Sequence, residues 1–391
     1  MVRTPARAWV MLTLGVAAQA AGTLVVTAPA LLIPHLHAQG MPLAQAGFLA
    51  AAPTAGMVLT LIAWGAVTDR VGERVVIAGG LVLTTITVVG AWLADDRLVP
   101  LGVAFLAAGM TSASTNAASG RVVVSWFPKE RRGLAMGIRQ MSQPLGVTLA
   151  AVTVPQLAET SGIRAALVLP VVLCAVLAVL CAVGIVDPPR PARSAVPTRV
   201  EANPYRSTAF LWRIHAVSVL LVVPQFTLST YGLVWLVSLG WSTAAAGLLV
   251  GGSQFVGAIG RILVGVWSDR VGSRVGPLRV VAVSAAVVMA LLALVDVTHL
   301  AAAAVVLVVA TSVTVADNGL AYTSVAEAAG PFWSGRALGA QNTGQFIAAS
   351  AVGPGIGALV GLVGFAGSFL LVAALPVLAL PLVPRADRSH D

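Results

Sequence analysis

The sequence predicts an all-α polytopic membrane protein with about twelve transmembrane helices in two repeated six-helix halves. Three observations predict this class: the composition, a series of long apolar segments and an internal repeat. Of the 391 residues, 58% are hydrophobic and 9% are charged, and the mean hydropathy is +0.94. A soluble domain carries roughly 25% charged residues. An exterior this poor in charge would aggregate in water, so the composition excludes a soluble protein.

The apolar segments have the length that a transmembrane helix needs, which is about 20 residues. In the first half we predict spans at 9–32, 43–66, 75–94, 99–123, 134–157 and 165–186. In the second half we predict spans at 214–237, 242–266, 280–295, 300–323, 337–361 and 365–384, of which the third is short. The first segment follows Arg3 and Arg7, as the apolar core of a signal peptide would. It is nevertheless long enough to span a bilayer, and we expect it to be the first helix.

The basic residues indicate how these spans are oriented. Loops predicted on one side of the membrane contain 18 of the 23 Lys and Arg residues, and loops on the other side contain only Arg97 and Arg164. Loops rich in Lys and Arg face the cytoplasm. We therefore expect a multi-pass protein of the cytoplasmic (inner) cell membrane with both termini cytoplasmic. Because the net charge of +9 is spread over these loops and forms no single patch, we expect no nucleic-acid partner.

The two halves of the sequence repeat each other. Residues 65–74 (GAVTDRVGER) return 200 residues later as 265–274 (GVWSDRVGSR). At an offset of 202, Asn116 matches Asn318, and the segment that starts at Gly133 matches the one that starts at Gly335. Halves with the same orientation favour a central site that opens to either side of the membrane. The predicted organisation is a six-helix bundle at 1–188, a cytoplasmic linker rich in Pro and Arg at 189–208, and a second bundle at 209–391.

The pattern G-x-x-x-D-R-x-G-x-R in both copies, together with 126–133 (WFPKERRG), resembles the major facilitator superfamily over nearly the whole chain. The resemblance implies a secondary transporter with a cytoplasmic gate. In that gate Asp69 points at the N-terminus of the eleventh helix near Ser334, where the helix dipole favours a carboxylate, and Arg121 is a second partner. The alternative is that these charges only set the topology. The predicted gate residues are Gly65, Asp69, Arg70, Gly72, Arg74, Arg121, Arg139, Gly265, Asp269, Arg270, Gly272 and Arg274.

Polar side chains are unevenly distributed among the spans. Spans three, six, nine and twelve contain no charged residue, Asn or Gln. Such side chains are costly in hydrocarbon and usually face a cavity or another helix. The resemblance implies that helices one, four, seven and ten line a central cavity. The candidate substrate-binding residues are Gln19, Asn116, Gln143, Gln225, Gln254, Arg261, Asp317, Asn318 and Gln345, although the neutral ones could equally be contacts between helices.

Arg261 is the strongest single candidate because it lies deep within its predicted span. Asp269 marks the cytoplasmic end of that helix, and Arg261 is about 12 Å along the helix from it. An arginine at mid-span costs about 2.5–3.5 kcal/mol, so it needs a polar partner or a ligand. It is similar to the eighth-helix arginine of monocarboxylate, oxalate–formate and nitrate porters, which implies an anionic substrate that accepts two parallel hydrogen bonds. The second-helix arginine of nitrate porters is replaced here by Leu61. The alternative is a structural ion pair with Asp317, a residue that could also carry a coupled proton.

Arg139 is open to two interpretations. It lies near the start of the fifth predicted span, on the same helix face as Gln143. Its long side chain could extend back to the cytoplasmic interface, or it could be a second cationic group or part of the gate.

The sequence therefore favours a secondary transporter of a small solute, in particular a small organic anion such as a carboxylate. The alternative is a proton-coupled drug or metabolite efflux antiporter, although the G-P-x-x-G-G motif of such antiporters is replaced here by 143–146 (QPLG). The chain carries no motif of a membrane enzyme, and Cys174 and Cys181 match no disulfide or metal pattern. We expect no enzymatic activity, cofactor or metal. The expected partners are a small-molecule substrate, a coupled proton and the lipid bilayer, bound by a monomer.

Overall fold

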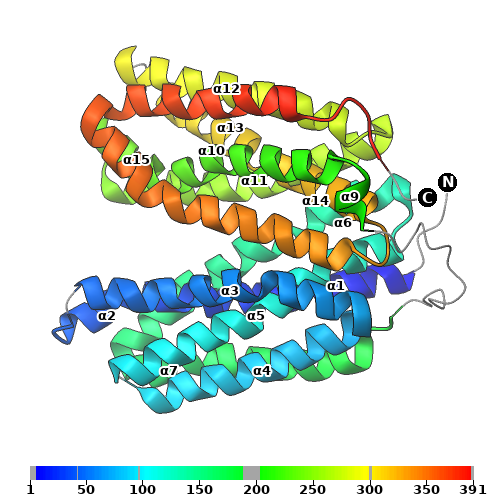
Figure 1. Cartoon of the computed structure of the whole chain (residues 1–391). Helices are drawn as coiled ribbons and strands as arrows, with labels where there is room; N and C mark the ends of the chain where they lie inside the picture. The colour runs from blue at the N-terminus through cyan, green and yellow to red at the C-terminus, as the bar shows by residue number, and fades with distance from the viewer. Residues whose placement is uncertain (1–5, 42, 96, 188–202, 299–301, 389–391) are drawn as a thin grey trace, which may run out of the picture. The chain divides into compact units, whose positions relative to one another are not determined.

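The computed structural model describes residues 6–41, 43–95, 97–187, 203–298 and 302–388, and these residues are mostly helical (Figure 1). The helices of the first half are α1 (Ala6–Leu31), α2 (Ile33–Ala38), α3 (Leu43–Val71), α4 (Glu73–Ala94), α5 (Leu98–Trp126), η1 (Lys129–Arg131), α6 (Arg132–Arg139) and α7 (Ser142–Gly184). Those of the second half are α9 (Pro204–Ser207), α10 (Phe210–Ser238), α11 (Thr243–Val271), α12 (Val275–Thr298), α13 (Ala303–Thr314), α14 (Asp317–Ala329), α15 (Ser334–Ala379) and η3 (Leu380–Leu382). The predicted all-α class is confirmed. Most of the predicted linker 189–208 lies outside the described residues.

Ten helical stretches of the described residues are long and apolar enough to cross a membrane. Two of them, Lys129–Gly184 and Ser334–Leu382, are 56 and 49 residues long, which is enough for two spans each. Each contains one glycine that breaks the helical geometry, Gly162 (φ 80°) and Gly364 (φ 71°), and these two glycines are 202 residues apart. Glycine adopts a positive φ at little cost. Dividing the two stretches at these glycines brings the number of spans to the predicted twelve.

The fifth span is interrupted, whereas the sequence predicted a continuous helix over 134–157. α6 ends at Arg139 and α7 begins at Ser142. Pro144 explains the interruption, because proline has no N–H group to donate to the carbonyl four positions earlier in a helix. That carbonyl belongs to Gln140 and is therefore open to another donor.

The tenth span is interrupted as well, whereas the prediction was a continuous helix over 300–323. α13 ends at Thr314 and α14 begins at Asp317. The three residues 313–315 are all β-branched, which disfavours a helix slightly. Aspartate is stabilised in the first turn of a helix. The interruption thus places the mid-span carboxylate at a helix N-terminus.

The ninth span is longer than the sequence predicted. α12 covers Val275–Thr298, which is 24 residues, in place of the predicted 280–295. The added N-terminal residues include Pro277 and Arg279, which interrupt the apolar run. Proline is tolerated in the first turn of a helix. The ninth helix is therefore long enough to cross a bilayer.

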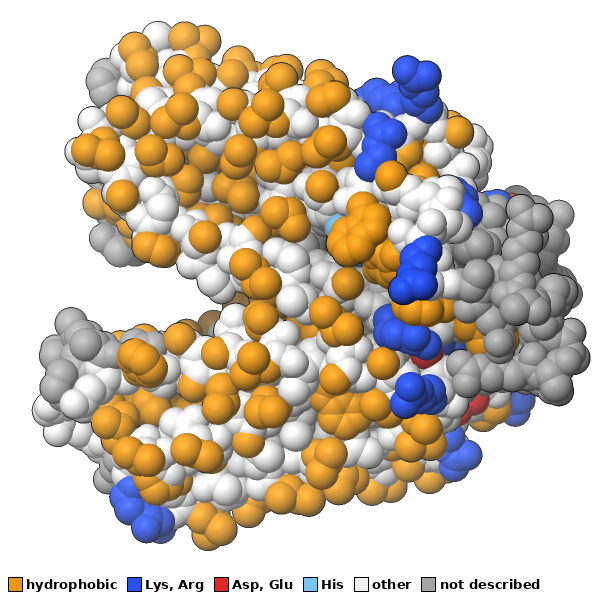
Figure 2. Space-filling view, viewed as in Figure 1, with side chains coloured by type: hydrophobic (Ala, Val, Ile, Leu, Met, Phe, Trp, Pro, Cys, Tyr) orange, Lys and Arg blue, Asp and Glu red, His pale blue; other side chains and the backbone are white. Residues whose placement is uncertain are grey.

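Large apolar side chains lie on the outer surface of the helical units as well as in their interior. Phe48, Leu248 and Leu362 are 84%, 80% and 79% exposed. Figure 2 shows hydrophobic side chains over most of the visible face of each unit, with basic side chains gathered near helix ends. A surface of this kind is stable against lipid and not against water. The chain is a multi-pass membrane protein.

The chain forms two compact units, each of which contains a short segment from the other half of the sequence. Unit 1 consists of Met1–Pro128, Met141–Glu201 and Pro331–Thr343. Unit 2 consists of Lys129–Gln140, Ala202–Gly330 and Gly344–Asp391. The start of α15 thus belongs to unit 1, and η1 and α6 belong to unit 2. The repeat in the sequence does not predict this exchange, and the division into bundles 1–188 and 209–391 stays a prediction.

Two aspartates 200 residues apart cap helices in the same way. Asp187 Oδ1 accepts hydrogen bonds from the backbone N–H groups of residues 73 and 74 at the start of α4, at 2.9 and 3.0 Å. Asp387 Oδ1 accepts from the N–H groups of residues 274 and 275 at the start of α12, at 2.9 and 3.0 Å. The first N–H groups of a helix have no partner within it, and a carboxylate satisfies them.

We expect Asp187→Ala and Asp387→Ala each to destabilise the detergent-solubilised protein by about 0.5–2 kcal/mol, the usual effect of losing a helix cap. Thermal unfolding should show a midpoint lower by about 2 °C or more in each variant. Asp95→Ala is the control, because Asp95 forms a partly exposed salt bridge to Arg164 at 3.2 Å. Exposed pairs contribute roughly 0–1 kcal/mol. Equal shifts in all three variants would contradict the capping role.

Candidate functional site

Arg261 lies on α11 in unit 2 and is buried, with 5% of its surface exposed. One guanidinium nitrogen (Nη1) donates a hydrogen bond to the backbone carbonyl of Gln140, at 3.2 Å. This is the carbonyl that Pro144 leaves without a helical donor. The guanidinium Nε has no hydrogen-bond partner. Arg261 is therefore held in place by a neutral group, and its capacity to donate hydrogen bonds is only partly used.

Asp317 is the first residue of α14, also in unit 2, and is 1% exposed. Neither of its carboxylate oxygens accepts a hydrogen bond of ordinary geometry. Asp317 and Arg261 interact electrostatically. However, no salt bridge within 4.0 Å joins these two described residues, so the structural ion pair considered as the alternative is not formed. A buried cation and a buried carboxylate thus lie near each other, and both retain unused hydrogen-bonding capacity.

Arg139 is buried at the end of α6, with 1% of its surface exposed, and does not extend to the membrane surface. Its guanidinium carbon lies 5.4 Å from the centre of the Tyr322 ring, a distance at which a cation is attracted to the ring face. Tyr322 interacts electrostatically with Arg139, Arg261 and Asp317. The sequence analysis missed Tyr322. Its position four residues after Asn318, on the same helix face, is the signal that could have found it.

A chain of hydrogen bonds connects Tyr322 to three of the candidate binding residues. The Tyr322 hydroxyl donates to Gln345 Oε1 at 2.8 Å. Gln345 Nε2 donates to Ser218 Oγ at 2.6 Å and to Asn318 Oδ1 at 2.8 Å. Asn318 Nδ2 donates to Gln225 Oε1 at 2.8 Å. These contacts join α10, α14 and α15 within unit 2 and hold the tyrosine in a fixed orientation.

Of the other candidate binding residues, three belong to unit 1 and one belongs to unit 2. Gln19 belongs to unit 1, where its Oε1 accepts a hydrogen bond from Ser119 Oγ at 2.8 Å. Asn116 is buried in unit 1, and Gln143 is half-buried there. Gln254 is half-buried on α11 in unit 2. Within unit 2, the structure therefore brings together Arg261, Asp317, Asn318, Gln225 and Gln345.

The contact predicted between Asp69 and the eleventh helix is present in unit 1. The carboxylate of Asp69 accepts hydrogen bonds from the backbone N–H groups of Gly335 and Arg336, at 2.8 and 3.1 Å, where α15 begins. Arg121 forms a salt bridge to Asp69 at 2.6 Å and a second one to Glu73 at 2.7 Å. The side chain of Arg336 adds a further ion pair to Asp69 at 3.1 Å. Sequence reasoning missed Glu73 and Arg336.

Unit 2 contains the matching arrangement around Asp269. Its carboxylate accepts hydrogen bonds from the N–H groups of Gly133 and Leu134, at 2.9 and 2.8 Å, where α6 begins. Arg274 forms salt bridges to Asp269 at 2.6 Å and to Glu327 at 3.3 Å. The acceptors and donors are at equivalent positions of the repeat, since residues 133 and 134 correspond to 335 and 336.

The arginine and the second acid around each aspartate exchange their helix positions between the two units. In unit 1 the arginine is on α5 (Arg121) and the second acid begins α4 (Glu73). In unit 2 the arginine stands at the start of α12 (Arg274) and the second acid is on α14 (Glu327). The same ion-pair network is thus built twice with the positions of the charges reversed, which explains why the repeat did not reveal Glu73 and Glu327.

Of the remaining predicted gate residues, Gly65 and Arg70 are on α3, Gly265 and Arg270 are on α11, and Arg74 is in the first turn of α4. Gly72 and Gly272 directly follow α3 and α11. Gly72 and Gly272 both have a positive φ, of 106° and 67°. Arg74 donates from Nε to the carbonyl of Ala182 at 2.6 Å, within unit 1. Arg70 and Arg270 are exposed. Arg74 thus binds a backbone carbonyl near the end of α7, and Arg70 and Arg270 lie at the surface.

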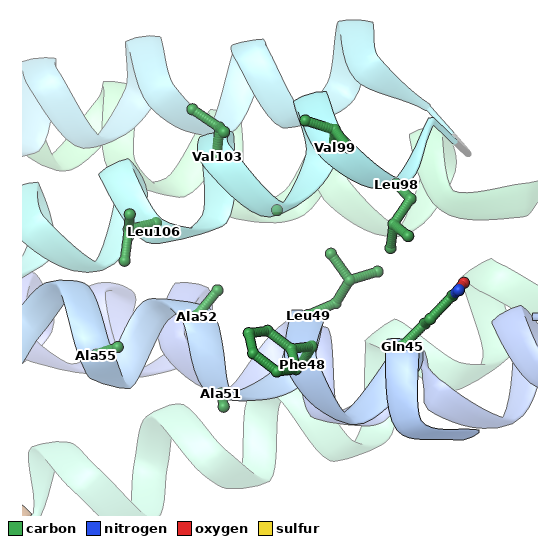
Figure 3. Close-up of a pocket in the computed structure, with 11 residues that line it drawn as sticks. Gln45, Phe48, Leu49, Ala51, Ala52, Ala55, Leu98, Val99, Val103 and Leu106 are labelled. Carbon is green, nitrogen blue, oxygen red and sulfur yellow. The ribbon is translucent and has the colours of Figure 1, made fainter. Parts of the chain in front are cut away.

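Unit 1 also contains an apolar groove of about 610 Å³ between α3 and α5 (Figure 3). Its lining includes Gln45, Phe48, Leu49, Leu98, Val103 and Leu106. Because it contains no charged side chain, we do not assign the site of a charged ligand to it.

Three comparisons with known proteins agree with this architecture. The family model described as Major Facilitator Superfamily matches residues 10–354. A relative described as an uncharacterized MFS-type transporter of Mycobacterium tuberculosis (strain H37Rv) is 44% identical over 378 residues, which cover 96% of this chain and 84% of that protein.

Two solved structures are similar in fold. The E. coli fucose:proton symporter is 15% identical with a TM-score of 0.73, and the match covers 95% of this chain and 97% of the symporter. The human organic anion transporter MFSD10 is 17% identical with a TM-score of 0.73, and the match covers 97% of this chain and 100% of that protein. At these identities the likeness concerns the fold alone.

Proposed function

Because the chain belongs to the major facilitator superfamily and is therefore a secondary transporter, we propose that it carries a small organic anion, such as a carboxylate, across the cytoplasmic membrane by alternating access. One observation carries the proposal. Arg261 is buried at mid-span, contacts only a backbone carbonyl by hydrogen bond, and keeps its Nε without a partner.

A buried guanidinium in this state favours an anion for a physical reason. An arginine at the centre of a span costs about 2.5–3.5 kcal/mol. A single hydrogen bond donated to a neutral carbonyl offsets only part of that cost. A carboxylate offers two parallel acceptor oxygens and a full opposite charge, and such bonds are roughly twice as strong as neutral ones. The binding energy of a carboxylate would therefore be large at this position.

Asp317 is the residue we propose for the coupled proton. Its carboxylate is buried and accepts no ordinary hydrogen bond. Arg261 is close enough to interact with it electrostatically. When the substrate anion binds Arg261, the charge of the arginine no longer compensates that of the Asp317 carboxylate. A proton then neutralises the buried carboxylate. The anion and the proton would then cross together.

Asp69 and Asp269 are the residues we propose for the cytoplasmic gate. Each holds the N-terminus of a helix through two backbone hydrogen bonds. Releasing those bonds would free the starts of α15 and α6. The same proposal places both termini on the cytoplasmic side, as the distribution of basic residues predicts.

The proposal is tested with the purified protein in proteoliposomes and a panel of radiolabelled short carboxylates. We expect at least one carboxylate to accumulate on the alkaline side of an imposed pH gradient, because the proton and the anion move in the same direction. The neutral amide of the same compound should not accumulate. If a lipophilic cation is moved in exchange for protons and no carboxylate is moved, the efflux alternative is correct and the proposal is wrong.

A further inference from the structure

We infer that the substrate carries a neutral polar group, an amide or a hydroxyl, several bonds away from its carboxylate. Arg261 would bind the carboxylate and Gln254 would bind the neutral group. The inference rests on the proposed function and narrows its substrate class. It is carried by the placement of these two side chains on one face of the same helix, α11, where both retain unused hydrogen-bonding capacity.

Gln254 differs from the other candidate amides of unit 2. Gln225, Asn318 and Gln345 are joined to one another by hydrogen bonds of 2.8 Å. The side chain of Gln254 is half-buried and makes no hydrogen bond within the described part of the chain. A glutamine amide has two N–H donors and a carbonyl acceptor. A hydrogen bond between helices therefore does not explain this residue, and its donors and acceptor are open to a ligand.

Gln254 lies near the middle of α11, on the side away from a row of exposed apolar residues. It is about 16 Å along the helix from Thr243, the first residue of α11. Phe255, Ile259 and Leu263 are exposed and follow one another at intervals of four residues. At 3.6 residues per turn this row is centred about 140° around the helix from Gln254. Polar groups at this depth face the bundle interior or a water-filled cavity, so the amide does not face lipid.

The spacing of Gln254 and Arg261 sets the length of the ligand. They are seven residues apart, which places them on nearly the same face with about 10.5 Å between their Cα atoms. Side chains incline toward the N-terminus of their helix, so the longer arginine side chain approaches the amide. An extended carbon chain advances by about 1.2 Å per bond, and a gap of about 6–9 Å thus needs roughly five to seven bonds.

The amide also determines the kind of group that it can bind. Glutamine is uncharged, so it cannot compensate for the burial of a second charged group. It can donate a hydrogen bond from Nε2 and accept one at Oε1. An amide or a hydroxyl group uses both functions. An α-hydroxy acid does not fit, because its hydroxyl is too close to its carboxylate to reach from Arg261 to Gln254.

The test measures the uptake of carboxylates with a terminal amide into proteoliposomes that contain the full-length protein. The probes are succinamate, glutaramate, adipamate and pimelamate, in which the carboxylate and the amide become progressively more distant. We expect adipamate or pimelamate to be taken up about fivefold or more faster than succinamate, as one additional hydrogen bond implies. Gln254→Met keeps the length of the side chain and removes its polar atoms. In this variant the ratio should fall to within about twofold while succinamate uptake changes little.

The control is Gln156→Met, because Gln156 is an exposed glutamine on α7 in unit 1. It should keep the wild-type ratio. Thermal unfolding of purified Gln254→Met checks its folding, and we expect no loss of stability because the side chain makes no hydrogen bond in the described structure.

The inference is overturned if the wild type shows no preference for the longer probes. It is also overturned if Gln254→Met keeps that preference or slows all four probes by the same factor. If all probes are taken up equally fast in an Arg261-dependent way, the proposed function still stands without this inference. If no uptake depends on Arg261, both the inference and the proposed function are wrong.

Discussion

Arg261→Gln is expected to lower carboxylate flux at least about 100-fold. The substitution removes the partner that the substrate carboxylate would have at this buried position, and removing one partner of a buried charge pair costs about 3–5 kcal/mol. Glutamine fits the space and can donate to the carbonyl of Gln140, which now receives the Arg261 guanidinium at 3.2 Å. It cannot supply a charge to a substrate. Arg261→Lys keeps the charge and loses the planar pair of donors. We expect its flux to lie between those of the wild type and the glutamine variant.

The measurement is initial uptake in proteoliposomes, with thermal unfolding of each purified variant as the check on folding. Because the substitution removes a buried charge, we expect the Arg261→Gln protein to unfold at a temperature no lower than the wild type. Arg164→Gln is the matched control and should transport normally. Undiminished carboxylate uptake by a well-folded Arg261→Gln protein would rule out the anion role of this residue.

Gly65→Ala is expected to produce the second largest effect, a loss of both stability and transport. A Cβ atom at residue 65 would lie 2.2 Å from the carbonyl oxygen of Gly335, at the start of α15. Ordinary contacts between such atoms are about 3.5–4.0 Å, so the two backbones must separate by about 1 Å or more. The hydrogen bonds of 2.8 and 3.1 Å from the start of α15 to Asp69 would then be broken or weakened.

Two effects of this substitution oppose each other, and their sizes decide the outcome. Alanine in place of glycine inside a helix stabilises it by roughly 0.5–1 kcal/mol. Overpacking costs about 1–3 kcal/mol, and each weakened bond to the Asp69 carboxylate costs about 1.5–3 kcal/mol more. The sum favours a lower unfolding temperature, and lower transport if the contact at Asp69 is the gate that we propose.

The control for this prediction is Gly79→Ala on α4, where an added Cβ meets no atom within 4 Å. That variant should be as stable as the wild type or slightly more stable. Gly265→Ala should behave like Gly65→Ala, because its Cβ would lie 2.2 Å from the carbonyl oxygen of Gly133 in unit 2. If Gly65→Ala and Gly79→Ala have the same unfolding temperature and the same flux, the close contact has no role in the gate.

Much of the fold could be predicted from the sequence because the relevant signals are local. The apolar segments and the repeated loops 65–74 and 265–274 led to the all-α class and the twelve spans, which the structure confirms. The interruptions of the fifth and tenth spans were not predicted. Pro144 was visible in the sequence, but proline near the start of a helix is also compatible with an unbroken span, so the pattern did not distinguish the two cases.

The candidate site was predicted less completely. Arg261 and Asp317 stand out in any reading because charged residues are rare at mid-span. Tyr322, Glu73 and Glu327 do not, since a tyrosine or an acid near a helix end is common. Their importance comes from what they contact, namely Arg139, Arg121 and Arg274.

The sequence by itself determined that this chain crosses the membrane, how many times it does so, and which loops and charges recur in its two halves. These properties depend on the side chains of consecutive residues and on the length of a helix that spans a bilayer. Only the tertiary structure decided that Arg261 contacts the Gln140 carbonyl without forming a salt bridge to Asp317, and that Arg139 covers Tyr322. Those contacts join residues from different helices, and their distances follow from packing, which no spacing along the chain specifies.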